Sequence, residues 1–99
     1  MNNIENLLVI TAEECAEVQQ AISKVLRFGV DNHYEEHCTN AMQIMTEYYQ
    51  LQAMVEELQK RSVLPYLMHE TIFNIKKSKI EKVNHYNEES RKLGRLDDN

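Results

Sequence analysis

Three acidic residues lie close together near the N-terminus, in the run Glu13-Glu14-Cys15-Ala16-Glu17. Glu14 and Glu17 are three residues apart, so on a helix their side chains project from the same side. Helical spacing aligns them with the apolar residues Leu7 and Ile10 and with Ala21, which predicts an inward-facing line. Two inward carboxylates repel each other and lose hydration, so they need a cation, a proton or water beside them. The alternative is an exposed acidic flank, which needs no partner.

A second polar pair, Glu47 and Gln50, has the same three-residue spacing. It lies beside a line of larger side chains at helical spacing, and both members are expected on the side of that line. The line consists of Ile44, Tyr48, Leu51, Met54, Val55 and Leu58. The simplest interpretation of the methionines and tyrosines in this region is that they fill a core or a subunit interface.

Three long helices are expected to position these residues, from about Ile4 to Phe28, Ala41 to Lys60 and Thr71 to Leu93. Asn2 or Asn3 is suited to cap the first helix, and Thr39 or Asn40 the second. Gly29 and Gly94 are suited to end the first and third helices in a left-handed conformation. The stretch from Val30 to Cys38 is predicted to be a loop. Pro65 begins a new segment, in which Tyr66 to Met68 form a short turn of helix or a buried connector.

The composition favours an all-α fold in a single domain, residues 1–99. The chain has only two glycines and one proline, too few for many short strands and their turns. We therefore expect an antiparallel bundle of three long helices plus a short connector. Four tyrosines and five methionines exceed what one small core needs, so we expect a homodimer or tetramer with the ligand site near a subunit interface; the tyrosines are Tyr34, Tyr48, Tyr49 and Tyr66.

The charge pattern narrows the possible partners. Eleven basic and sixteen acidic residues leave a net charge of −5, which argues against nucleic-acid binding. No apolar run is long enough to cross a membrane, and we expect a cytoplasmic protein with two free thiols, Cys15 and Cys38.

His33 and His37 are four residues apart, and they are either metal ligands or solvated loop residues. Four lysines gather at Lys76, Lys77, Lys79 and Lys82, either as a solvated basic face or as an attraction for an anionic ligand.

The order of these motifs resembles the MazG-like superfamily of all-α nucleoside triphosphate pyrophosphohydrolases. Its motif is Glu-Glu-x-x-Glu on one helix and Glu-x-x-Asp on the next. The first half is present as Glu13-Glu14-Cys-Ala-Glu17, and the second is similar to Glu47-Tyr-Tyr-Gln50. The run from Ser23 to Gly29 and the lysine-rich C-terminal part resemble the small phage-encoded members, which would place the protein in a host cytoplasm.

The resemblance implies cleavage of a nucleoside triphosphate between its α and β phosphates, giving a monophosphate and pyrophosphate. It implies Mg²⁺ or Mn²⁺ as a weakly bound cofactor, with Glu14, Glu17 and Glu47 as catalytic metal ligands and Gln50 in the fourth ligand position. Glu13 would either contact the metal ligands without binding the metal itself or be exposed to solvent. The implied contacts to the nucleotide and its phosphates come from Lys24, Arg27, Tyr48, Lys76, Lys77 and Lys79.

Gln50 departs from the family pattern and leaves two functions open. An amide oxygen can ligate Mg²⁺, but it brings no charge and cannot act as a base for water. The chain is then either a weakened pyrophosphohydrolase or a nucleotide-binding protein that sequesters a nucleotide or nucleotide-derived signal. A third possibility, a purely structural helical oligomer, leaves the inward acids unexplained.

Overall fold

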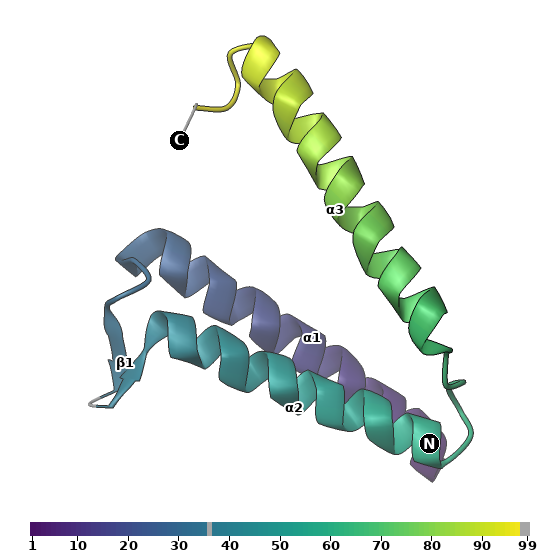
Figure 1. Cartoon of the computed structure of the whole chain (residues 1–99). Coiled ribbons are helices and arrows are strands. Elements are labelled where there is room, and N and C mark those ends of the chain that lie inside the picture. The colour runs from purple at the N-terminus through teal and green to yellow at the C-terminus, as the bar shows by residue number, and fades with distance from the viewer. Residues whose placement is uncertain (36, 98–99) are drawn as a thin grey trace. The chain divides into compact units, whose positions relative to one another are not determined.

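Helices make up most of the chain in the computed structural model, which describes residues 1–35 and 37–97 (Figure 1). The helices are α1, Asn3–Phe28; α2, Asn40–Lys60; and α3, His69–Lys92. Two short strands, β1 at His33–Glu35 and β2 at Cys38–Thr39, lie between α1 and α2. The prediction of an all-α fold built on three long helices is confirmed.

The helix α1 begins and ends where the sequence predicts. The side chain of Asn2 accepts a hydrogen bond from the backbone N–H of Glu5 at 2.8 Å, which caps the first turn. Gly29 ends the helix, and its N–H donates to the carbonyl oxygen of Val25 at 2.8 Å. Gly29 has φ 90° with an extended ψ of 158°, rather than the left-handed helical conformation expected. A residue with a Cβ is strained at this φ, so glycine is required for the chain direction here.

The connection between α1 and α2 contains a short antiparallel ribbon, so the prediction of a loop from Val30 to Cys38 is wrong for His33–Glu35 and for Cys38, while residues 30–32 and His37 lie outside the strands. His33 pairs with Thr39 and Glu35 with Cys38, with an irregular register between them. The pairing was missed because so short a run shows no alternation of polar and apolar residues. The side chain of His33 lies outside the described part of the structure, so the proposed histidine pair stays untested.

Asn40 joins the ribbon to α2 and is buried, with 4% of its surface exposed. Its side-chain amide donates to the carbonyl oxygen of Gly29 at 3.1 Å, and its backbone N–H donates to that of Asn32 at 2.7 Å. The next N–H, of Ala41, donates to Val30 at 3.2 Å. These bonds hold the start of α2 against the end of α1, while Thr39 caps α2 through the N–H of Met42, as predicted.

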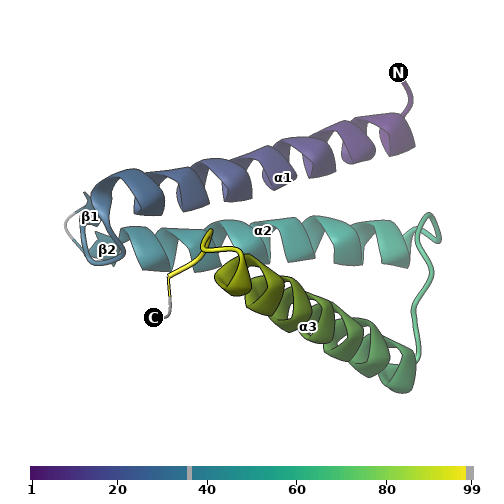
Figure 2. The same cartoon turned by 90° about the horizontal axis from the view of Figure 1, so that it is seen from above.

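The helices α1 and α2 pack along their length as an antiparallel hairpin (Figures 1 and 2). Buried and half-buried residues recur in alternating steps of three and four, the spacing at which helices pack side by side. We call these residues the seam. On α1 the seam is Ile4, Leu7, Thr11, Glu14, Val18, Ala21 and Val25; on α2 it is Asn40, Ile44, Glu47, Leu51, Met54 and Leu58. Leu58 is the most deeply buried of them, at 1% exposed.

The helix α2 ends in a tight turn that closes the hairpin unit. The N–H groups of Val63 and Leu64 both donate to the carbonyl oxygen of Leu58, at 2.9 and 3.3 Å. Ser62 has φ 61°, the left-handed conformation that reverses a chain after a helix. The hairpin and this turn form one compact unit, Met1–Pro65.

The second unit, Tyr66–Asn99, consists of a connector and α3. Tyr66, Leu67 and Met68 have no helical turn and are 69%, 48% and 73% exposed, so the expected helical or buried connector is wrong. The reason is that no described residue of α3 is buried, so the unit offers no core for these three side chains. Gly94, with φ 72°, ends the helix as predicted.

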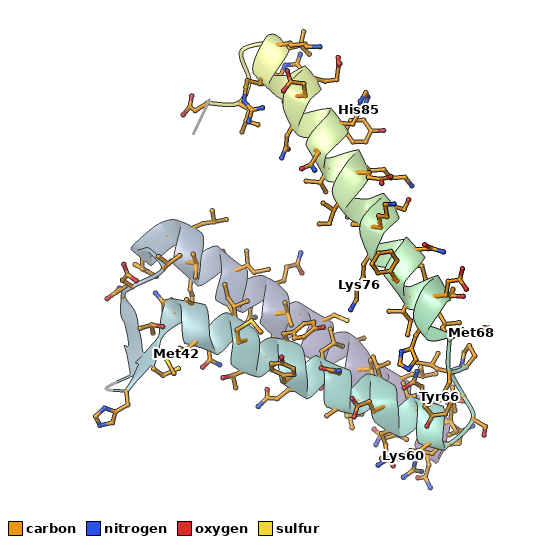
Figure 3. All side chains as sticks on the ribbon, viewed as in Figure 1. Met42, Lys60, Tyr66, Met68, Lys76 and His85 are labelled. Atoms are coloured by element: carbon orange, nitrogen blue, oxygen red, sulfur yellow. The ribbon has the colours of Figure 1, made fainter. Side chains whose placement is uncertain are left out.

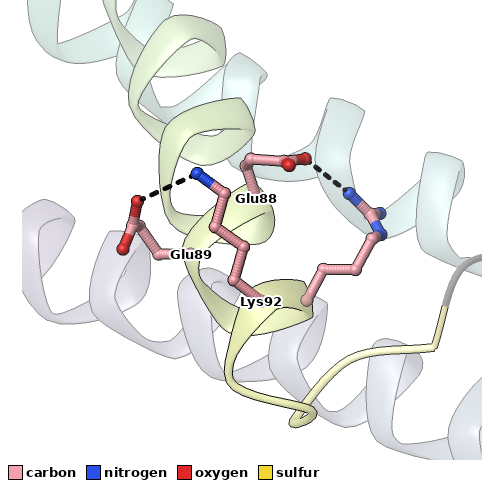
Figure 4. A network of polar contacts seen from close by, with 4 residues as sticks. Glu88, Glu89 and Lys92 are labelled. Carbon is pink, nitrogen blue, oxygen red and sulfur yellow. Dashed lines mark hydrogen bonds and ion pairs between the residues drawn. The ribbon is translucent and has the colours of Figure 1, made fainter.

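Ion pairs lie along the last turns of α3. Glu88 pairs with Arg91 at 3.2 Å and Glu89 with Lys92 at 4.0 Å (Figure 4). Pairs three residues apart on an exposed helix stabilise it by only about 0.2–0.5 kcal/mol each. These ion pairs therefore contribute little to the stability of α3. It stays a prediction that all three helices pack into one bundle and form one domain.

No described helix is both long and apolar enough to cross a membrane.

We predict that Asn40→Ala lowers the free energy of unfolding by about 1–3 kcal/mol, because it removes the buried side-chain amide that donates to the carbonyl oxygen of Gly29. Urea unfolding followed by circular dichroism measures the change. The control is Asn6→Ala, which alters an exposed asparagine on the same hairpin. Equal stability of the two variants would show that the Asn40 side chain does not hold the turn.

Candidate functional site

Glu14 lies in the seam of the hairpin, where α1 faces α2. The repeat that brings Leu7 and Ala21 inward also brings Glu14 inward, as predicted. One carboxylate oxygen, Oε2, is buried and has no hydrogen-bond partner among the described residues. A buried polar atom without a partner destabilises a fold by about 1–3 kcal/mol, and a charged one by more. Glu14 is therefore the acidic residue with the strongest need for a cation, a proton or a ligand.

Glu47 lies in the seam of α2 and is half-buried. Its Oε1 accepts a hydrogen bond of 2.6 Å from Nε2 of Gln43, one turn earlier on the helix. The other end of that amide, Oε1 of Gln43, lies 3.6 Å from the thiol of Cys38, which donates to it. Gln43 thus orients Glu47, a role that was not predicted. The signal was present in the sequence as a Gln–Glu pair four residues apart on one helix.

Glu17 and Gln50 are both exposed, so the prediction that they face inward is wrong, although the other members of the predicted α1 line, Leu7, Ile10, Glu14 and Ala21, are buried or half-buried. The seam runs through Thr11 and through Val18, the residue after Glu17. Thr11 fits this position because its hydroxyl donates to the carbonyl oxygen of Leu7 at 2.7 Å. On α2 the seam runs through Leu51, which turns the preceding Gln50 outward. The choice between two lines one residue apart depends on how the helices face each other.

Glu17 and Gln50 nevertheless share one face of the hairpin. Each comes directly before a seam residue, Val18 or Leu51. In an antiparallel pair of right-handed helices, the positions before seam residues on both helices turn to the same side. We call this side the polar face, and it includes Glu13, Glu17, Gln20 and Lys24 of α1 and Gln43, Thr46, Gln50 and Glu57 of α2.

The hydrogen bond between Asn40 and Gly29 sets which residues lie level with each other along the hairpin. Counting from that bond at 1.5 Å per residue, Glu17 and Gln50 differ in level by about 3 Å. By the same count Glu14 and Glu47 differ by about 12 Å, with Glu17 and Gln50 between them. The four motif residues therefore form a row along the hairpin rather than a single ring of ligands.

The side-chain oxygens of the four motif residues are of the kind that binds a hard cation, but these residues are too spread out along the hairpin to surround a single ion. Carboxylate and amide oxygens are the ligands that Mg²⁺ takes, at 2.0–2.1 Å in an octahedral shell. Among the described residues, no three histidine, cysteine or acidic side chains come together as a metal-binding group. Within residues 1–35 and 37–97, Oε2 of Glu14 is the buried carboxylate oxygen without a hydrogen-bond partner. Metal binding by this row stays a prediction.

The predicted nucleotide contacts of the hairpin fall on different sides. Lys24 is half-buried on the polar face, near the level of Glu47. The guanidinium of Arg27 lies 5.1 Å from the centre of the Phe28 ring, a cation–π contact. Tyr48 comes directly after Glu47 and therefore turns to the face opposite Glu17. Its ring packs edge-to-face against Tyr49 at 5.1 Å between centroids.

The predicted phosphate-binding lysines Lys76, Lys77 and Lys79 belong to the second unit and are exposed on α3. Figure 3 shows Lys76 as a long side chain that projects from the helix. Lys76 and Lys77 border a shallow apolar hollow lined by Phe73 and Ile80. An exposed lysine beside apolar surface can bind an anion, since its stem packs while its ammonium stays in water.

Comparison of this chain with protein-family models, with curated proteins and with solved structures found no match. The likeness to MazG-like proteins therefore depends on the resemblance of the motif residues, the run from Ser23 to Gly29 and the lysine-rich C-terminal part.

We predict that Glu14→Leu raises the free energy of unfolding by at least about 1 kcal/mol without divalent ions, because it removes the unpartnered buried oxygen. Thermal or urea unfolding in a chelating buffer measures this. Glu17→Leu is the matched control, since Glu17 is exposed on the same helix and its replacement should change stability by less than about 0.5 kcal/mol. A destabilised Glu14→Leu variant would mean that this carboxylate has a stabilising partner.

Proposed function

We propose that the protein is a MazG-like nucleotide pyrophosphohydrolase, weakened by glutamine at the fourth ligand position. The observation that carries this proposal is the buried and unpartnered carboxylate oxygen of Glu14. A helix that served only to pack would be more stable with leucine at this position. The fold instead keeps a carboxylate in the seam, at a cost in stability that a bound cation or ligand would offset.

The residues proposed to hold Mg²⁺ or Mn²⁺ are Glu14, Glu17, Glu47 and Gln50. A bound divalent ion would polarise a phosphate oxygen and lower the pKa of an attacking water. In this proposal, Gln43 and Glu17 have separate tasks. Gln43 keeps the carboxylate of Glu47 in one orientation through its 2.6 Å hydrogen bond. Glu17, exposed on the polar face, is accessible to a ligand that approaches from solvent.

The proposed reaction is cleavage of a nucleoside triphosphate between its α and β phosphates. The row of motif residues extends over about 12 Å, more than one ion and its ligands occupy. The triphosphate itself would supply the further oxygens that complete the coordination. Gln50 supplies no negative charge and cannot take a proton from water, so we expect slow turnover. Loss of one group that acts in the transition state commonly lowers a rate by about 10²–10³.

A second candidate function is binding without cleavage, and the composition of the polar face favours it. Gln20, Gln43 and Gln50 all lie on this face beside Glu17. An amide both donates and accepts hydrogen bonds and carries no charge, so it can recognise a base or a ribose without repelling phosphate. Such a protein would sequester a nucleotide or a nucleotide-derived signal.

We predict that Gln50→Asp raises turnover of the best-bound nucleoside triphosphate by at least about 10-fold, because it restores a fourth charged ligand. Calorimetric titration with a nucleotide panel, with and without Mg²⁺, selects the substrate. Chromatography of the recovered nucleotide then measures monophosphate and pyrophosphate. Glu14→Ala should abolish turnover, whereas Glu56→Ala should not, since Glu56 is exposed on the far side of α2 from the seam.

The same experiment separates the two candidate functions. Monophosphate and pyrophosphate that appear with the original chain and vanish in Glu14→Ala would support the enzyme. Tight binding with the nucleotide recovered intact, for both the original chain and Gln50→Asp, would support the binding protein. No binding of any nucleotide would contradict both.

A further inference from the structure

Cys38 belongs to the ribbon, yet its side chain lies close to the first turn of α2. It is the first residue of β2 and pairs with Glu35 across the ribbon. The next two residues begin the helix, since Thr39 caps it and Asn40 is buried at its start. The backbone on both sides of Cys38 is therefore held by hydrogen bonds, which gives its thiol a fixed position relative to α2.

Two hydrogen bonds connect this thiol to the carboxylate of Glu47. The thiol donates to Oε1 of Gln43, with 3.6 Å between Sγ and Oε1. Nε2 of the same amide donates to Oε1 of Glu47 at 2.6 Å. The carbonyl oxygen of Thr39 is a second acceptor for the thiol, at 3.5 Å. The side chains of Cys38, Gln43 and Glu47 are all half-buried, and we call them the thiol–amide–carboxylate series.

The two ends of the Gln43 amide are not equivalent in this series. An amide oxygen only accepts hydrogen bonds, and an amide NH₂ group only donates them. With the oxygen turned toward Glu47, two acceptors would face each other and the hydrogen bond would be lost. The S–H of Cys38 donates to the oxygen from the other side, so it favours the orientation in which Nε2 faces the carboxylate.

The bond between Gln43 and Glu47 is too weak to fix the amide without help. A side-chain pair four residues apart on a helix favours its paired form by only about two-fold. Glutamine also loses much conformational freedom when its long side chain is held in one place. A second contact at the far end of the amide therefore decides how much of the time Nε2 stays on Glu47.

We propose that Cys38 is a positioning residue for Glu47 and acts through the amide of Gln43. In this proposal Cys38 binds neither a metal nor a nucleotide. The proposal rests on the proposed function only for its effect on turnover, because the contacts of the series are present without any ligand. It makes the ribbon part of the candidate site, since a residue of β2 sets the orientation of the seam carboxylate on α2.

The first test is a spectroscopic comparison of two substitutions in the full chain. Cys38→Val keeps an apolar side chain that suits a strand but removes the donor, whereas Cys38→Ser keeps a donor. Nuclear magnetic resonance of the side-chain amide of Gln43 reports its hydrogen bonds, and Gln43→Leu identifies its signals by their loss. Cys38→Val should move these N–H signals toward those of an exposed glutamine, and Cys38→Ser should leave them near their original positions. Unchanged signals in Cys38→Val, or equal shifts in both variants, would overturn the proposal.

The second test is turnover of the best-bound nucleoside triphosphate with Mg²⁺. Because Thr39 shares the thiol proton, the effect is at most that of one neutral hydrogen bond. Cys38→Val should lower turnover by about 3- to 10-fold, and Cys38→Ser should keep it within about two-fold of the original chain. In Gln43→Leu, which lacks the amide, adding Cys38→Val should have no further effect. Cys15→Val is the matched control, since Cys15 is an exposed thiol on α1, and it should leave turnover unchanged.

Together the two tests separate failure of this proposal from failure of the proposed function. If no chain hydrolyses a nucleotide, the proposed function fails, and the amide signals alone decide whether Cys38 positions Glu47. If a nucleotide is hydrolysed and Cys38→Val is as fast as the original chain, the proposed function stands and this proposal fails. A further loss of turnover when Cys38→Val is added to Gln43→Leu would show that Cys38 acts by another route, which would also overturn the proposal.

Discussion

The buried side chain of Asn40 holds the turn on which the geometry of the hairpin depends. Its amide bonds to Gly29 and its backbone N–H bonds to Asn32, which joins the end of α1 to the start of α2. Because both helices are rigid over more than five turns, one fixed point at the turn sets the level of every residue along them. A different pairing at the turn would shift α2 along α1 and separate Glu17 from Gln50.

The register of the hairpin also divides its surface into faces with different chemistry. One side is rich in carboxylates and amides, the other has exposed apolar side chains such as Leu8, Ile22 and Met45, and the seam between them contains both packing residues and two carboxylates. Placing Glu14 in the seam reduces the stability of the hairpin, because its Oε2 has no partner there. The arrangement is typical of a functional site, where local stability is lower so that charged groups are available for a ligand.

The exposed positions of the polar face can vary without disturbing the seam. A substitution there would change ligand chemistry and leave the packing of the two helices in place. Gln50 illustrates this case, since it replaces an expected acid at an exposed position where packing imposes no constraint.

The sequence by itself determined the three helices, their caps and the inward position of Glu14. These features depend on short-range physics: the spacing of apolar residues, the Asn2 and Thr39 caps, and the positive φ available to glycine. Only the tertiary structure decided that Glu17 and Gln50 face solvent and that a ribbon joins the helices. A helix offers neighbouring residues as candidates for the same inward position, as Glu17 and Val18 do on α1. Only the neighbouring helix selects between them, because the line that is buried is the one that packs against it.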